Sequence, residues 1–195
     1  MPTFNGWTIL NPPSYPPCPA TLEWQANDNI GVTENPFTRQ QLTQDQNASW
    51  LEASASWQPM SNKQAIAWCA WMMSLRGQLC AFQLGDPLNL GPQNSAAVAP
   101  TVSGANQTGY SLVTTGGSNM TVGDWIQLGY RAYRITSIAG GTLGIWPQIR
   151  ESPANSATTS LTNVQILWKL KTNVRKWSVS RVKLYGIQLE LREAL

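Results

Sequence analysis

The sequence contains no histidine, so it lacks the side chain that most often acts as a general base near neutral pH. The same absence removes the commonest ligand of zinc and other transition metals. The three cysteines, Cys18, Cys69 and Cys80, have no metal-ligand spacing, and an odd number does not fit a disulfide framework. We expect Cys69 to lie in a helix and Cys80 in a strand, each as a small buried apolar residue.

Charged residues are also scarce. They make up 12% of the 195 residues, about half the usual share for a soluble domain. Charges are depleted from interface cores, so a surface of this kind suits a subunit whose faces meet other subunits. The ten tryptophans fit that interpretation because tryptophan is favoured at interface hot spots. A β-rich core with aromatic side chains at its edges explains any single tryptophan equally well.

Long apolar runs are missing as well. No run approaches the roughly 20 residues that span a bilayer. The first residues lack the basic and apolar regions of a signal peptide. We therefore expect no membrane anchor, and a protein that stays in the cytoplasm unless a larger particle carries it out.

Apolar spacing predicts a strand followed by a helix. Apolar and polar side chains alternate from Trp50 to Trp57, which is the period of a half-buried strand. Ser61 with Gln64 predicts a capped helix start. We expect the helix to end near Arg76, with Gly77 in a left-handed conformation. Its apolar stripe comprises Ala65, Trp68, Cys69, Met72 and Leu75.

Trp71 lies outside that stripe in this interpretation, which makes it the best helical candidate for contact with another chain. Alternation from Cys80 to Leu84 predicts the next strand. Earlier in the chain, Leu22–Gln25 is expected to be a short strand and Asn27–Asn29 a turn.

Two further groups of strands follow. The first comprises Trp125–Leu128, Tyr133–Ile138 and Leu143–Ile149, whose short lengths and glycine turns suggest a small barrel. The second comprises alternating segments that end in Leu170 and Leu191. The sequence thus predicts a mainly β protein with one main α-helix, of the α+β class.

The expected organisation has four parts. Residues 1–21 form an arm, in which the proline-rich stretch 12–19 is too polyproline-like to complete a strand ladder. Residues 22–100 and 161–195 form one outer domain. Residues 101–160 form a small β insert within it.

No combination of residues predicts catalysis. Asp86 and Asp124 each follow a glycine at a strand boundary, where an aspartate usually orders a turn. The glycines between Gly104 and Gly109 lack the lysine and the strand–loop–helix frame of a phosphate-binding loop. We expect no enzymatic activity, no catalytic residues, no cofactor and no metal site.

Basic residues are concentrated near the C-terminus. Because Trp168 and Trp177 lie among them, a nucleic-acid surface must be considered. Lysines also occur on the wet faces and edges of strand pairs, and that solvated or subunit-facing interpretation is favoured. The basic residues are Lys169, Lys171, Arg175, Lys176, Arg181, Lys183 and Arg192.

An ordered set of fragments from residue 35 to the end resembles the distal tail, or minor tail, proteins of siphophages, which belong to the tail tip and baseplate hub. The fragments are Asn35–Thr38 with Gln40 and Gln41, the Trp50 strand, Pro59-Met60, Leu75–Gly77, Phe82–Pro87, Gln107–Gly109, Gly123–Gly129, Trp146–Glu151 and Tyr185–Ile187.

This resemblance implies a virion protein at the tail tip, assembled in the host cytoplasm. It implies a split-barrel-like "belt" domain with one helix and a small β-barrel insert. Six copies would form a ring that joins the tail tube protein to the hub and receptor-binding proteins, and tape-measure protein and DNA would pass through its lumen. The insert is short, so a sugar-binding role is not carried over.

The residues that we expect at subunit interfaces are Trp71, Trp50, Phe37, Tyr15 and Trp177. Lys169, Lys171, Arg175 and Lys176 are candidates for facing the lumen or an acidic partner.

Three alternatives stay open at this point. The first is a head–tail connector or tail-terminator ring subunit. The second is a carbohydrate-binding module that uses exposed tryptophans such as Trp125 and Trp146. The third is a nucleic-acid-binding protein.

Overall fold

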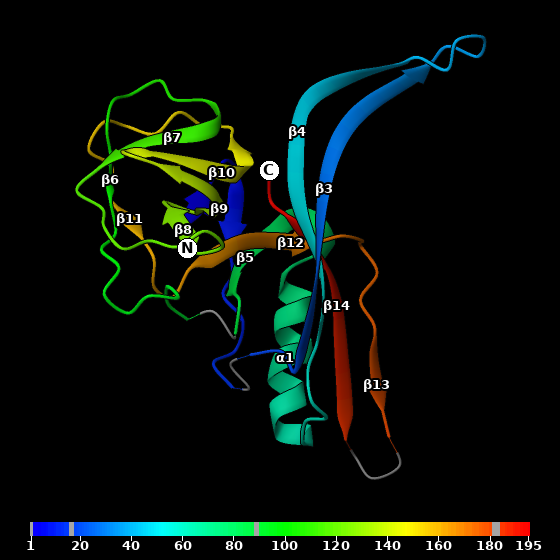
Figure 1. Ribbon diagram of the computed structural model, residues 1–195. Helices are drawn as coiled ribbons and strands as arrows, with labels where there is room; N and C mark the ends of the chain where they lie inside the picture. Colours follow the sequence, from blue (N-terminus) through cyan, green and yellow to red (C-terminus); the bar gives the residue numbers. More distant parts are fainter. Residues whose placement is uncertain (1, 16–17, 88–89, 181–183) are drawn as a thin grey trace.

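The fold is described from a computed structural model that covers residues 2–15, 18–87, 90–180 and 184–195. Strands make up 51% of the chain, and the described residues contain a single α-helix, which confirms the expected mainly β, α+β class. The strands form two sheets, one curled into a half-barrel and one into a near-barrel (Figure 1). The described part of the chain holds no helix with the length and apolar character needed to cross a membrane.

The larger sheet has eight strands and combines segments from both ends of the chain. Strand β2 pairs with β5 in parallel, and the other described pairs are antiparallel. Beside β14 also lies β13 (Trp177–Val179). The main path runs β1 (Thr3–Phe4), β2 (Trp7–Ile9), β5 (Cys80–Gly85), β12 (Gln165–Leu170), β14 (Tyr185–Glu193), β4 (Gln41–Ser56) and β3 (Thr21–Glu34).

The strand and helix predicted after Trp50 are both present. In β4 the alternating Leu51, Ala53 and Ala55 are buried, as the period-2 pattern predicted. Helix α1 (Asn62–Ser74) begins after Ser61, whose backbone N–H donates to the side chain of Gln64 at 3.0 Å. The helix is followed by Gly77 with φ +72°, the left-handed conformation expected there, and by the 3-10 turn η1 (Gly77–Leu79).

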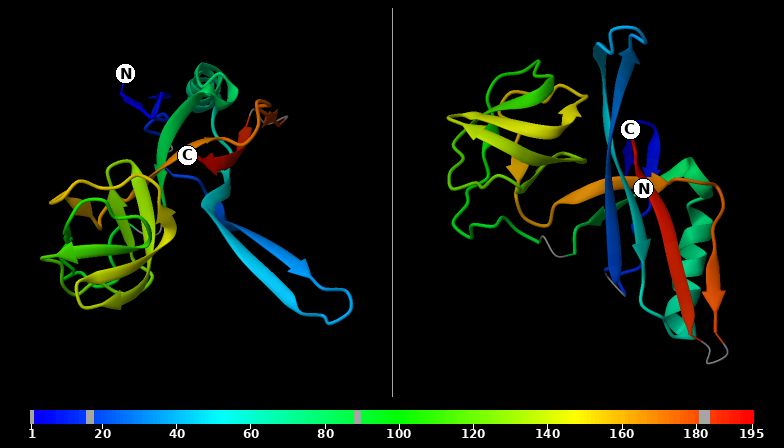
Figure 2. Two further views of the ribbon diagram at one scale, coloured as in Figure 1. Left: turned by 90° about the horizontal axis from the view of Figure 1, so that it is seen from above. Right: turned by 45° about the vertical axis from the view of Figure 1, so that its right-hand side comes forward.

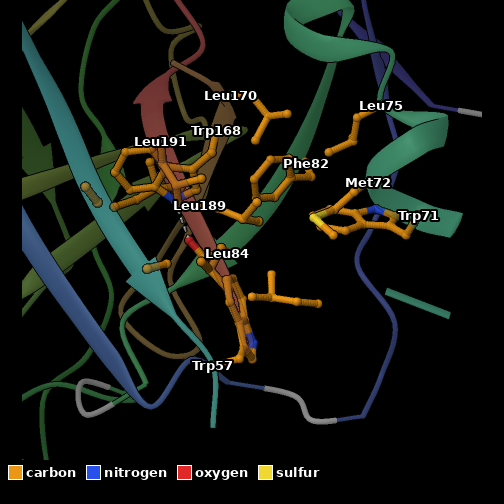
Figure 3. Packing of buried hydrophobic residues seen from close by; sticks show 14 of the residues in the cluster. Trp57, Trp71, Met72, Leu75, Phe82, Leu84, Trp168, Leu170, Leu189 and Leu191 are labelled. Carbon is orange, nitrogen blue, oxygen red and sulfur yellow. Dashed lines mark hydrogen bonds between the residues drawn. The ribbon is translucent and has the colours of Figure 1, made fainter. Parts of the chain in front are cut away.

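The core of the larger sheet lies between its strands and α1, and aromatic rings run through it (Figure 3). Ring centroids are 4.6 Å apart for Trp57 and Trp68, 5.3 Å for Trp68 and Trp71, and 5.0 Å for Trp71 and Phe82. The tilted and edge-on geometries are those in which aromatic pairs add to simple burial. The helix is therefore fixed to the sheet mainly by aromatic packing.

The second sheet is formed between Thr101 and Ser160 and has a core of its own. A bridge between Thr101 and Thr158 brings its two ends together. The sequence predicted β8, β9 and β10 but missed β7. The strand order is β11 (Thr159–Ser160), β8 (Trp125–Leu128), β9 (Arg131–Ala139), β10 (Thr142–Ile149), β7 (Gly109–Thr115) and β6 (Thr101–Val102). We call this unit the insert.

The two sheets meet through aromatic contacts. Trp125 of the insert packs against Trp24 of β3, with ring centroids 5.7 Å apart. Trp24 in turn contacts Trp168 at 5.6 Å, so the insert reaches the core of the larger sheet. The guanidinium of Arg134 also contacts the Trp125 ring, 5.0 Å from its centre.

Strands β3 and β4 are much longer than predicted. They contain 14 and 16 residues, and the outer part of the hairpin that they form extends well beyond the other strands of the larger sheet and beyond the second sheet (Figures 1 and 2). The turn predicted at Asn27–Asn29 is wrong, because β3 continues through it with only a shift of register between Asp28 and Ile30. The true turn lies between Glu34 and Gln41. Strand β3 is also the last strand of the sheet order, so no strand among the described residues pairs with its outer edge.

Replacement of Trp168 by alanine tests the core. The Trp168 side chain is fully buried and its indole N–H donates to the Leu84 carbonyl at 3.0 Å. We expect Trp168→Ala to lower the free energy of unfolding by about 3–5 kcal/mol. Urea unfolding measures the change. Trp177→Ala is the matched control, because Trp177 is 42% exposed, and it should cost less than about 1 kcal/mol. Equal losses in the two variants would contradict this description of the core.

Candidate subunit-interface surfaces

The outer part of the β3–β4 hairpin is exposed on both faces. We call residues 29–47 the distal hairpin, and every residue in it except Gly31 is exposed. The exposed fractions of its large apolar side chains are 53% for Ile30, 58% for Val32, 73% for Leu42 and 93% for Phe37. This part of the molecule therefore contributes surface but no core.

The tip of the distal hairpin is ordered by its own side chains. The Asn35 carboxamide oxygen accepts the backbone N–H groups of Phe37 at 2.9 Å and Thr38 at 3.3 Å. Arg39 forms an ion pair with Glu34 at 2.9 Å, and this pairing lowers the pKa of Glu34. The tip consequently presents the Phe37 ring to solvent from a defined turn.

Of the five predicted interface residues, three lie on the surface. Phe37 and Tyr15 are well exposed, at 93% and 64%, and Trp177 is exposed at 42%. Trp50 is half-buried, because the Arg192 guanidinium lies 5.0 Å above its ring and its indole N–H donates to Glu52. These residues come from four parts of the chain: the arm, the hairpin tip, β4 and β13.

The expectation that Trp71 faces outward is wrong. Trp71 is only 8% exposed, and its indole N–H donates to the Leu10 carbonyl at 3.0 Å. At about 100° per residue, Trp71 lies only about 60° around the helix from Trp68, so the buried stripe is centred on Trp68. Cys69 lies farther round and is half-buried, whereas Cys80 is buried as expected.

The basic candidates are mostly engaged within the chain. The Lys169 ammonium lies 4.7 Å from the centre of the Trp7 ring, and burial lowers its pKa. Lys171 pairs with Glu52 at 2.8 Å, which raises the pKa of Lys171 and lowers that of Glu52. These two cations therefore stabilise the larger sheet rather than form a free basic surface.

Arg175 also makes contacts within the chain. It donates to the carbonyls of Met72 and Met73 at the end of α1, where cations are favoured by the helix dipole. Lys176 is exposed. Arg181 and Lys183 lie outside the described residues. The described C-terminal cations mostly contact other groups of the chain, so their arrangement does not support a nucleic-acid-binding surface.

Sequence reasoning missed a group of charges at the junction of the two sheets, which we call the junction cluster: Arg131, Arg150, Glu151 and Glu193. Arg131 is 8% exposed and lies 3.2 Å from Glu151 and 3.8 Å from Glu193. It also donates to the Ala194 carbonyl. Glu193 is 4% exposed and accepts the Leu51 N–H at 3.2 Å. The cluster thus joins β9 of the insert to β14 and β4.

Burial controls the protonation of this cluster. It raises the pKa of Glu193, and the nearby Arg150 and Arg131 offset only part of that effect. Burial also lowers the pKa of Arg150 and raises the pKa of Tyr133 to about 12. The alternation of β14 contained a signal for this site, because Glu193 continues the buried series of Ile187, Leu189 and Leu191.

Two of the candidate sites considered from the sequence have structural roles. Among the described residues, no three His, Cys, Asp or Glu side chains lie together where they could hold a metal. Asp124 is 3% exposed and accepts backbone N–H groups from Thr121 at 2.8 Å and Gln93 at 2.9 Å, so its turn-ordering role is confirmed. Trp125, considered as a sugar platform, is 6% exposed and cannot present its ring.

No protein-family model matches this sequence, and no curated protein matches it.

The pH dependence of stability tests the junction cluster. A carboxyl whose pKa is raised by folding contributes stability below its ordinary value of 4.5, and this contribution is lost as the pH rises through the raised pKa. We therefore expect the free energy of unfolding of the wild type, relative to Glu193→Gln, to fall as the pH rises above 4.5. Urea unfolding at a series of pH values gives the measurement.

Glu190→Gln is the control, since it removes an exposed carboxylate from the same strand. A wild-type advantage over Glu193→Gln that grows with pH would show that ion pairing outweighs burial.

Proposed function

We propose that this chain is a structural subunit of a homo-oligomeric ring at the distal end of the tail tube of a long-tailed bacteriophage. The distal hairpin is the observation that supports it most strongly. A two-stranded hairpin exposed on both faces is marginally stable alone in water, so a partner surface is expected to cover it. Its few charges, Glu34, Arg39 and Asp45, suit burial in an interface.

The accessible surface of the chain supports the same proposal. A compact monomer of 21.4 kDa is expected to expose about 9,100 Å². This chain exposes 10941 Å². A standard protein–protein interface buries about 800 Å² of each partner, so the excess of about 1,800 Å² is roughly what one subunit would bury in two such interfaces, one with each neighbour in a ring. The extended hairpin accounts for the non-compact shape (Figure 2).

The other parts of the proposal rest on the resemblance of the sequence fragments. In this proposal the larger sheet with α1 is a split-barrel-like belt, and six copies close the ring. Its neighbours are the tail tube protein, the hub and the receptor-binding proteins, and its lumen passes tape-measure protein and DNA. The chain works in the virion as a non-enzymatic subunit. A head–tail connector or tail-terminator ring could use the same hairpin. Labelling the protein in intact virions separates these possibilities, because it shows at which end of the tail the protein lies.

Shortening the hairpin tests the ring. Residues 31–44 are replaced by Asn-Gly, a two-residue turn that closes antiparallel strands, while the root at Asp28 and Ser49 is kept. We expect the wild type to have the molar mass of an oligomer by light scattering and to appear as a ring by electron microscopy. The shortened variant should be a folded monomer by the same two methods. A wild-type chain that stays monomeric at every concentration would contradict the proposal.

A point variant tests the tip without changing the hairpin length. Phe37→Ser should weaken ring formation, because it removes the most exposed aromatic side chain, at 93%. Val122→Ser serves as the control, since it also replaces an exposed apolar side chain, at 54%, but in the insert. If both substitutions weaken ring formation equally, the hairpin tip does not contribute specifically to the interface.

A further inference from the structure

The distal hairpin is joined to the body through an irregular segment. Asp28 pairs with Ser49, but the next pair is Ile30 with Asp45, so β4 carries extra residues at this point. Within them Asn47 has φ +50°, and its backbone N–H is held by the Asp45 carboxylate at 2.8 Å. Such a bulge interrupts the ladder and bends the strand. Regular pairing therefore does not fix the direction of the distal hairpin.

The insert contacts the chain at this bulge. The Trp146 indole N–H donates to Asp28 at 2.9 Å, and the Gln148 backbone N–H donates to the Ser49 hydroxyl at 3.1 Å. The Gln148 carboxamide donates to the Asn47 carbonyl. Arg150, which follows β10, donates to the Ser49 carbonyl. Every one of these bonds joins the insert to a residue next to the irregular pairs.

Alternation along β10 explains this contact. Ile145 and Ile149 point into the core of the insert, at 1% and 3% exposure. Trp146, Gln148 and Arg150 lie on the opposite face, which meets the root of the hairpin. One strand therefore holds the insert together and at the same time contacts both strands of the hairpin.

The insert is itself held firmly against the larger sheet. Trp125 packs on Trp24, and Arg131 contacts Glu193 and donates to the Ala194 carbonyl. These contacts lie outside the bulge and involve no residue of the distal hairpin, so they fix the position of β10 independently of the distal hairpin.

We propose that the insert is a clamp that fixes the direction of the distal hairpin through Trp146 and Gln148. The hairpin can bend at the bulge, and the contacts of β10 hold the distal hairpin in one direction. Because the direction of the hairpin depends on β10, a displacement of the insert would move the hairpin tip. The consequence for ring assembly rests on the proposed function, whereas the hairpin angle does not.

Distance measurements between two spin labels test the clamp. The natural cysteines are replaced (Cys18→Ser, Cys69→Ala, Cys80→Ala), and labels are placed at exposed Thr38 in the tip and exposed Lys63 in α1. In this background the distance distribution should be narrow. In Trp146→Phe with Gln148→Ala it should broaden and shift, because the indole–Asp28 and carboxamide–Asn47 bonds are lost.

Trp50→Phe is the matched control. It also removes an indole–carboxylate hydrogen bond, from Trp50 to Glu52, but one that does not reach the insert. Its distribution should stay narrow. Asp28→Ala breaks the same clamp bond from the exposed hairpin side, so it gives a second reading if the double variant folds poorly. An unchanged narrow distribution in Asp28→Ala and the folded double variant would overturn the clamp.

Assembly gives a separate outcome. If the wild type forms rings and the clamp variants form fewer, the clamp orients the hairpin for its partner. If the wild type never forms rings, the proposed function fails, while the label distances still decide whether the clamp exists.

Discussion

The structure depends on the continuity of one strand, β4. Its inner half places Leu51, Ala53 and Ala55 in the core and pairs with both β3 and β14, so it is held on both edges. Its outer half pairs only with β3 and leaves the body. Because one strand belongs to both regions, the core that α1 covers is also the foundation of the distal hairpin. Loss of packing beneath the inner half of β4 would therefore affect the distal hairpin as well as the core.

The scarce charges are used mainly for internal contacts. Lys169 lies on Trp7, Lys171 pairs with Glu52, and Arg175 binds the end of α1. In a chain with so few charged residues, this commitment leaves an outer surface dominated by neutral polar and apolar groups. The basic C-terminal region is therefore better explained by the needs of the sheet than by a single binding face.

The sequence was informative wherever one face of an element is buried. The alternation of β4 and β14 and the cap at Ser61 depend on a difference between inside and outside, and that difference is visible as a period. The distal hairpin has no such difference, because both of its faces are exposed, so the turn was placed too early. Trp71 was misplaced for another reason: the stripe was centred too far from Trp68, although Trp71 lies only about 60° from it around the helix, and the Leu10 carbonyl that accepts its indole N–H is distant in sequence. The junction cluster and the contact of β10 with the hairpin likewise depend on long-range packing.

The open edge of β3 has a consequence for the isolated chain. From Thr21 to Glu34 this edge contains no lysine, arginine or proline, the residues that usually discourage strands of different molecules from pairing. An edge of this length is a template for any extended chain that meets it. Its charged residues are Glu23, Asp28 and Glu34, so repulsion between carboxylates is the main protection of this edge, and acid that neutralises them would favour edge-to-edge association of the isolated chain.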